Sequence, residues 1–421
     1  MSVSLSDFAA SVTVETAFNV LAVAKQLKAG GKRVVELEIG DSPFASTAHA
    51  KEAGLAAIEH NHTRYCPSAG LPEYREAVST FVNEQYGLDT TSANVVAGHG
   101  AKIFELLFCE TFLNPGDGVL VFSPYFPTYL PNIARRQGRV WLSDLKQENN
   151  FRPNLADVER FLKEDDHPKA IFLNSPHNPT GGVATEDDLR GLADLVRGKN
   201  VAVFSDEPYD RMVWQGQHHT LLAQPDMFEQ CVAAYTFSKS YSMSGWRLGY
   251  AVSSAAIAEM LGKLINTSLS CVPPLTQLAG VAALRSDAAE RDESMSKFRE
   301  KVELLVGLLN GVAGVKCLMP GGTFYVFPNV AAICNDLGIT SHGLAMYLLE
   351  GADDEFGVAC LGGECFGQAG GGFLRFSCAE PNDLLEEAVK FLPEAFSRRD
   401  RVDAYLETHP DYRIETAYDI A

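Results

Sequence analysis

The chain has 421 residues, of which 46% are hydrophobic and 21% are charged. This length and apolar content allow a sizeable core and favour two closely packed domains. No apolar run approaches the ~20 residues that span a bilayer, and the start of the chain lacks the pattern of a signal peptide. The net charge of −19 disfavours binding to nucleic-acid phosphates. We therefore expect neither a membrane nor a nucleic acid as a partner.

Nine cysteines are scattered along the chain, and no C-x-x-C pair occurs. The sequence therefore predicts neither a structural zinc site nor a redox dithiol. Most of the cysteines stand in apolar stretches, such as Val358-Ala-Cys360-Leu. Free, mostly buried thiols are typical of a reducing compartment, so we expect a cytoplasmic protein.

Helical and strand periodicities alternate along the chain. Residues 8–29 predict an amphipathic helix that ends at Gly30-Gly31, and Val34–Ile39 predicts a short strand. Up to about residue 285, short apolar strands alternate with helical segments. These predicted strands are Gly118–Ser123, Lys169–Asn174, Val201–Ser205 and Val232–Phe237. The alternation predicts an α/β fold with a mainly parallel wound sheet, helices on both faces and ligands beyond the carboxyl ends of the strands.

The last third of the chain has a different pattern. Asp287–Leu309 predicts a long charged helix, and strands are expected near Tyr325–Phe327 and Phe373–Ser377. We expect a large domain over 44–285 and a smaller α+β domain from 1–43 and 286–396. Residues 397–421 are polar and charged, and we expect them to form a tail.

Lys239 follows a predicted buried strand and stands among small hydroxyl residues. A lysine in such a place can act as an amine nucleophile or a base, although a single lysine is more often a solvated surface residue. Here Arg247 and the neighbouring Ser and Thr residues add an anion pocket. The combination favours a reactive lysine beside a phosphate site.

Two further strand ends carry polar residues. Asn178, in Asn174-Ser-Pro-His-Asn178-Pro-Thr-Gly, has an even chance of being an ordinary turn residue. Asp206 closes an apolar strand, where an unpaired carboxylate is costly. It could cap the next helix, or it could hold a cationic ring nitrogen.

Nine short motifs occur in order from about Ala17 to Phe396. They are Ile39-Gly40, Tyr65-Cys-Pro-Ser-Ala-Gly70, Gly100-Ala101-Lys102, Pro115-Gly-Asp117, Asn178-Pro-Thr-Gly, Asp206-Glu-Pro-Tyr209, Ser238-Lys239, Gly245-Trp-Arg247-Leu-Gly-Tyr250 and Arg375-Phe-Ser. Through them the chain resembles the fold-type I, pyridoxal-phosphate-dependent aminotransferases of class I/II. The resemblance implies a large domain with a mainly parallel sheet, a smaller α+β domain and pyridoxal 5′-phosphate as cofactor.

The resemblance also implies roles for single residues. Lys239 would form the Schiff base with the cofactor and then move protons. Asp206 would pair with the pyridine nitrogen, and Asn178 and Tyr209 would bind the 3′ oxygen. Phe126 aligns with the aromatic residue that stacks on the ring, although a core role is equally compatible with its type.

The cofactor phosphate has a predicted cradle. Gly100, Ala101 and Lys102 precede a helical stretch over Ile103–Phe112, so backbone N–H groups point toward an anion. Thr236 and Arg247 would complete this cradle. By resemblance, Tyr65 would reach the phosphate from the partner subunit of a homodimer.

Substrate recognition is predicted in part. Arg375 lies in an apolar stretch that makes a poor surface strand, and its planar guanidinium suits the α-carboxylate of amino and 2-oxo acids. By resemblance, Asn178 and Gly40 would assist. Lys102, Tyr125 and His99 could shape the side-chain pocket, but His99 could as well be a turn residue and Lys102 could face solvent.

The resemblance implies transfer of an amino group between an L-amino acid and a 2-oxo acid by a ping-pong mechanism. A carbon–sulfur β-lyase, or another elimination enzyme of the same fold, remains an alternative, because it would use the same residues. A non-catalytic transcription sensor is disfavoured by the charge and by the absence of room for a helix-turn-helix before Ala17.

Overall fold

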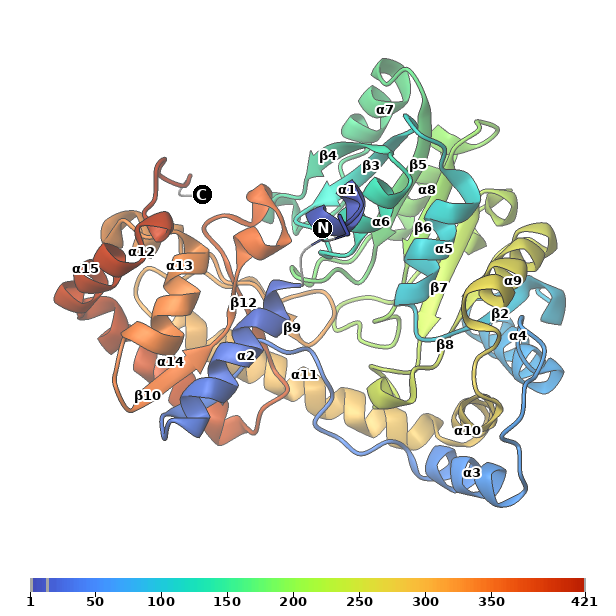
Figure 1. Ribbon diagram of the computed structural model, residues 1–421, viewed down its shortest axis with the longest axis horizontal. Coiled ribbons are helices and arrows are strands. Elements are labelled where there is room, and N and C mark those ends of the chain that lie inside the picture. The colour runs from blue at the N-terminus through green and yellow to red at the C-terminus, as the bar shows by residue number, and fades with distance from the viewer. Residues whose placement is uncertain (1–2, 13–14, 420–421) are drawn as a thin grey trace.

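A seven-stranded sheet organises the larger part of the molecule (Figure 1). The computed structural model describes residues 3–12 and 15–419. Along the sheet the order is β2-β8-β7-β6-β5-β3-β4. The bounds are β2 (Val95–Gly98), β3 (Gly118–Ser123), β4 (Arg139–Asp144), β5 (Pro168–Asn174), β6 (Ala202–Asp206), β7 (Cys231–Thr236) and β8 (Gly249–Val252). All pairings from β7 to β4 are parallel, and only β8 runs antiparallel to its neighbours. The predicted α/β fold with a mainly parallel sheet is confirmed.

Helices cover both faces of this sheet. On one face lie α5 (Lys102–Phe112), α6 (Tyr129–Arg135) and α9 (Ala255–Leu269). On the other lie α4 (Pro72–Tyr86), α7 (Leu155–Glu164), α8 (Glu186–Val196) and α10 (Pro274–Ser286), and α3 (Ala48–Glu59) packs on α10. In β5, Phe172 joins the first apolar core, whereas Ile171 and Leu173 join the second. Both faces are therefore apolar, which explains the continuous apolar runs of the central strands.

The smaller part of the molecule is built from both ends of the chain. Its two-stranded sheet pairs β1 (Arg33–Glu36) with β10 (Phe356–Ala359) in parallel, with Arg33 opposite Phe356. A second sheet has the antiparallel order β11 (Leu361–Gly362), β12 (Leu374–Ser377), β9 (Tyr325–Val326). The helices are α2 (Thr16–Ala29), α11 (Ala288–Asn310), α12 (Ala331–Leu337), α13 (Ser341–Met346), α14 (Asn382–Ser397) and α15 (Arg399–Thr408). In Figure 1, α11 runs from beside α10 into this smaller part and so connects the two.

The prediction of one continuous helix from Phe8 to Ala29 is wrong. The structure has a short helix α1 (Asp7–Ser11), capped by Ser6, and then α2. Val12 has extended backbone angles, which agrees with the low helix propensity of β-branched residues. Residues 13 and 14, also inside the predicted helix, lie outside the described residues. The interruption places Glu15 ahead of α2 rather than within a helix.

The last segment, 397–421, forms more than the expected tail. It contains α15, whose Val402 and Leu406 are buried in the same apolar core as α14. Farther on, Tyr418 exchanges two hydrogen bonds with Asn335 through its backbone. We propose the predicted division of the chain into a large domain at 44–285 and a smaller one, extended to include α15. Among the described residues no helix has the length and apolarity needed to span a bilayer.

Candidate active site

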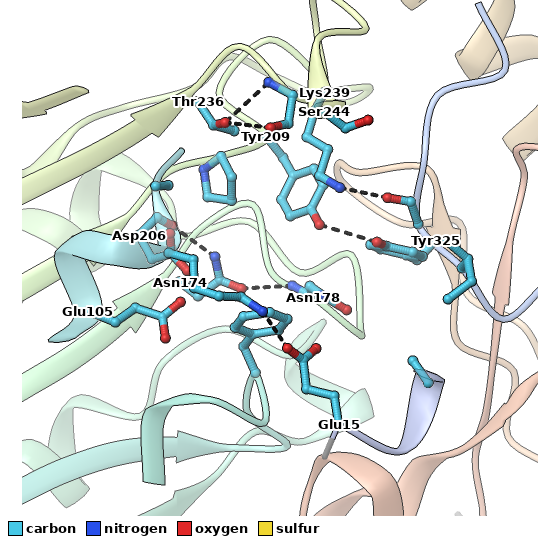
Figure 2. A pocket seen from close by; sticks show the side chains of 18 of the residues that line it. Glu15, Glu105, Asn174, Asn178, Asp206, Tyr209, Thr236, Lys239, Ser244 and Tyr325 are labelled. Carbon is cyan, nitrogen blue, oxygen red and sulfur yellow. Dashed lines mark hydrogen bonds and ion pairs between the residues drawn. The ribbon is translucent and has the colours of Figure 1, made fainter. Parts of the chain in front are cut away.

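A cavity of about 340 Å³ lies where the carboxyl ends of the sheet strands face the smaller part of the molecule (Figure 2). Eleven of the predicted site residues line it: Gly40, Ala101, Lys102, Phe126, Asn178, Asp206, Tyr209, Thr236, Lys239, Arg247 and Arg375. They come from loops and strand ends that are far apart in the sequence. The parallel sheet brings Asp206 and Thr236 together because its strands end at one edge, whereas Gly40 and Arg375 come from the smaller part of the molecule.

Lys239 follows β7 and extends its amine into the cavity. Its Nζ donates a hydrogen bond to the backbone oxygen of Gly40 at 2.6 Å. The same nitrogen lies 5.8 Å from the ring centre of Tyr209 and 5.6 Å from that of Phe324. A half-buried amine with one carbonyl partner and aromatic walls is held in one place, yet it stays open to a reactant on the cavity side.

Asp206 ends β6, in register with Asn174 at the end of the neighbouring strand β5. Asn174 donates from Nδ2 to the backbone oxygen of Asp206 at 2.8 Å. Its Oδ1 accepts the backbone N–H of Asn178, also at 2.8 Å. The hydroxyl of Tyr129 donates to Asp206 Oδ2 at 2.5 Å. Burial raises the pKa of Asp206, and this hydrogen bond partly offsets the effect, so the carboxylate is suited to a cationic partner.

An anion cradle lies at the start of α5. Gly100 has φ +81°, and a Cβ at this position would lie 2.8 Å from Nη2 of Arg247. The glycine therefore permits both the backbone turn and the close approach of the guanidinium. Arg247 donates from Nη2 to the backbone oxygen of His99 at 3.1 Å, while Thr236 closes β7 beside it. The start of α5 has no side-chain cap, and its helix dipole adds a partial positive charge to the cradle.

Arg375, on β12, lines the cavity from the smaller part of the molecule. It is 4% exposed and lies between the rings of Tyr325 and Phe366, at 4.2 Å and 4.9 Å. Its Nη1 donates to Asn178 Oδ1 at 2.9 Å, and its Nη2 donates to the backbone oxygen of Glu38. Nε has no hydrogen-bond partner within the described residues. The guanidinium is held rigidly, which suits it to a planar carboxylate ligand.

Four residues named in the sequence analysis stand outside the cavity lining. Gly100 lies immediately behind it, against Arg247. Tyr65 is 89% exposed and does not line the cavity of its own chain. His99 contributes its backbone oxygen to Arg247, and burial lowers the pKa of its imidazole. Neither His99 nor Tyr125 lines the cavity.

Several cavity residues were not predicted from the sequence. The hydroxyl of Tyr325 accepts a hydrogen bond from the hydroxyl of Tyr209 at 3.3 Å. Asn174 donates a hydrogen bond to the backbone oxygen of Asp206, as described above. Three carboxylates also line the cavity, namely Glu15, Glu38 and Glu105. Burial raises the pKa of Glu38 to about 7 and that of Glu105 well above its usual range. A strand-end signal existed only for Asn174; the others depend on contacts between distant segments.

Comparison with known proteins identifies the family. Residues 32–392 match the family described as aminotransferase class I and II. The chain belongs to this family. The aspartate aminotransferase of Pyrococcus horikoshii is 32% identical over 86% of this chain and 90% of its own length. Among solved structures, the Thermus thermophilus aspartate aminotransferase with maleate has a TM-score of 0.87 and 28% identity, over 94% of this chain and all of its own.

The aminotransferase relatives differ in their named substrates. A solved structure of an aromatic aminotransferase from Pyrococcus horikoshii is also similar, with a TM-score of 0.79 and 29% identity over 92% of this chain and 99% of its own. Enzymes of this family depend on pyridoxal phosphate, and this chain is an aminotransferase of that kind. The cavity fits such a cofactor, because an amine (Lys239), a buried carboxylate (Asp206) and an anion cradle (Gly100, Arg247) all border it.

Proposed function

We propose that this aminotransferase moves an amino group between an L-amino acid and a 2-oxo acid in two half-reactions of a ping-pong mechanism. The observation that carries the proposal is the convergence of Lys239, Asp206 and Arg375 on one cavity. An amine, a carboxylate with a raised pKa and a rigid guanidinium are the groups needed to bind a cofactor aldehyde, a ring nitrogen and a substrate carboxylate.

Specific residues would hold pyridoxal phosphate. The phosphate would lie against Gly100, Ala101, Lys102, Thr236 and Arg247, while Asp206 would bind the ring nitrogen. Asn178 and Tyr209 would donate to the 3′ oxygen, Phe126 would support the ring, and Lys239 would attach covalently. When bound, the cofactor withdraws electrons from the substrate Cα and so makes its proton acidic.

Lys239 would then move that proton, because its amine lies in the cavity and is held there by the backbone oxygen of Gly40. Tyr129 would keep Asp206 ionised through its 2.5 Å hydrogen bond. Arg375 would bind the substrate α-carboxylate together with Asn178, which is already its partner. The backbone of Gly40 would also contact the substrate carboxylate. The carbonyl oxygen of Gly40 accepts a hydrogen bond from Lys239 and would hold this amine in position.

We also propose that the enzyme works as a homodimer with a shared active site. The support is the exposure of three large side chains: Tyr65 is 89% exposed, and Leu55 and Ile58, three residues apart on α3, are 65% and 52% exposed. Exposed apolar side chains on one helix face are compatible with an interface. The tyrosine would then reach the phosphate of the partner subunit. A reducing cytoplasm is the proposed location, since all nine cysteines are free thiols.

An absorbance spectrum of the purified protein with added pyridoxal phosphate tests the proposal. We expect a band near the visible edge that is lost in Lys239→Ala. One amino acid should convert this band to a shorter-wavelength form, and a 2-oxo acid should restore it. Release of ammonia and pyruvate with an unchanged band would instead establish elimination. No band at all would overturn the proposal.

A further inference from the structure

An ion pair forms one wall of the cavity. Nζ of Lys102, the first residue of α5, pairs with a carboxylate oxygen of Glu15, which precedes α2. Both residues line the cavity, and Figure 2 shows the Glu15 side chain directed toward it from the N-terminal segment. The Lys102 amine also lies 4.9 Å from the ring centre of Phe126. The pair therefore joins the two parts of the molecule beside the proposed cofactor site.

The side-chain charge of Lys102 is not used in the proposed mechanism, because the phosphate would contact only the backbone of this residue at the start of α5. Four cationic side chains line the cavity within the described residues: Lys102, Lys239, Arg247 and Arg375. The proposed function uses the last three for the cofactor and the substrate α-carboxylate. A second carboxylate, on the side chain of an acidic substrate, would thus have only Lys102 as its counter-charge.

Glu15 already supplies a carboxylate to this lysine. Its side chain is 18% exposed and that of Lys102 is 45% exposed, so the pair is partly shielded from water. Glu105 and Asp206 lie on the large-domain side of Lys102; burial raises the pKa of both carboxyl groups, and the charge of Lys102 partly offsets this rise. An incoming dicarboxylate would therefore have to displace Glu15 and leave it without its partner near two other acidic groups.

We propose that Glu15 is a specificity-determining residue that selects against dicarboxylic substrates by holding Lys102. The preferred substrates are then L-amino acids with neutral side chains and the matching 2-oxo acids. A neutral side chain leaves the ion pair intact, and Ala17 and Phe18 offer it apolar surface on the same wall. Specificity would then come from repulsion between the Glu15 carboxylate and the second carboxylate of a dicarboxylic substrate. This inference rests on the proposed transamination.

The test compares kcat/KM for L-aspartate and L-leucine in the holoenzyme. The wild type should prefer leucine. Glu15→Gln frees Lys102 and should raise the aspartate-to-leucine ratio by about fivefold or more, which is the scale of a partly exposed ion pair. Adding Lys102→Met to this variant should cancel the gain. Glu259→Gln breaks an exposed ion pair with Lys263 on α9, outside the cavity, and should leave the ratio unchanged.

Maleate supplies a readout that needs no turnover. Titration of each holoenzyme with this unreactive dicarboxylate, followed by cofactor absorbance or calorimetry, should give at least about fivefold tighter binding to Glu15→Gln than to the wild type. An unchanged maleate affinity, or a wild type that prefers aspartate, would overturn the inference. If no amino acid reacts, the proposed transamination fails, whereas the maleate comparison still decides the role of Glu15.

Discussion

Gly40 lies so close to Tyr325 that an added methyl group should disable the site. A Cβ at Gly40 would stand 1.6 Å from the Tyr325 hydroxyl oxygen and 2.6 Å from the ring carbon that bears it. Because non-bonded atoms approach no closer than about 3.5 Å without repulsion, the hydroxyl would have to move by roughly 2 Å. Tyr325 is 2% exposed, so its ring has no free space to enter.

Displacement of the Tyr325 hydroxyl would disturb three groups of the proposed mechanism. Tyr325 contacts the hydroxyl of Tyr209 at 3.3 Å and the guanidinium of Arg375 at 4.2 Å, while the Gly40 oxygen accepts from Lys239. Overpacking of a buried site costs ~1–3 kcal/mol of unfolding free energy. Misplacing reacting groups by about 1 Å lowers turnover by about a hundredfold. We therefore expect Gly40→Ala to lose about two orders of magnitude in kcat/KM and only part of its stability.

Steady-state kinetics and urea denaturation of the Gly40→Ala holoenzyme measure both effects. Gly307→Ala is the matched control, because this glycine lies in α11, is exposed, and has no atom within 4 Å of an added Cβ. It should keep its kcat/KM and gain up to ~1 kcal/mol from the better helix propensity of alanine. Wild-type kinetics and stability in Gly40→Ala would refute the reasoning.

Three further predictions concern other parts of the molecule. Tyr129→Phe removes the hydrogen bond that lowers the pKa of Asp206, so pyridoxal phosphate should bind about tenfold more weakly in a fluorescence titration. Burial raises the pKa of Glu38 from 4.5 to about 7, so the folded protein keeps a proton that the unfolded chain has lost. The contribution of this group to the unfolding free energy therefore falls as pH rises from 4.5 to about 7. In urea denaturation, the unfolding free energy of Glu38→Gln should exceed that of the wild type by more at pH 8 than at pH 5. Leu406→Ala should cost ~2–5 kcal/mol in the same assay while the absorbance spectrum of the holoenzyme stays unchanged, and a wild-type midpoint would exclude a structural role for α15.

The central strands were predictable because they are buried on both faces. The predicted strand Gly118–Ser123 matches β3 at both ends, and the strand predicted at Val232–Phe237 is β7 shifted by one residue. An edge strand carries a weaker signal. In β4 the apolar run has only three residues, Val140-Trp141-Leu142, and Val140 and Leu142 are exposed, so the run is too short to mark the strand.

The cavity was predictable where its residues stand in local motifs. Lys239 and Asp206 follow apolar strands, and the sheet places such strand ends at one edge. Glu15 and Tyr325 carry no local signal, because their place in the cavity depends on how the smaller part docks on the sheet. Helix α15 also carries no local signal, because most of its residues are polar. Its apolar residues Val402 and Leu406 are buried only because the helix packs on the core of the smaller part.

The pairing of β1 with β10 determines when the enzyme can be completed during synthesis. From β4 to β8, each strand of the large sheet pairs with at least one strand that precedes it in the chain, so it finds a partner that is already synthesised. Arg33, by contrast, has to wait for Phe356, and Arg375 emerges later still. With the proposed roles, Lys239 and the phosphate cradle would therefore be synthesised well before the arginine that would bind the substrate carboxylate. A nascent chain would then hold the residues for its cofactor before it could bind an amino acid, so the proposed reactive centre would stay idle until translation is nearly finished.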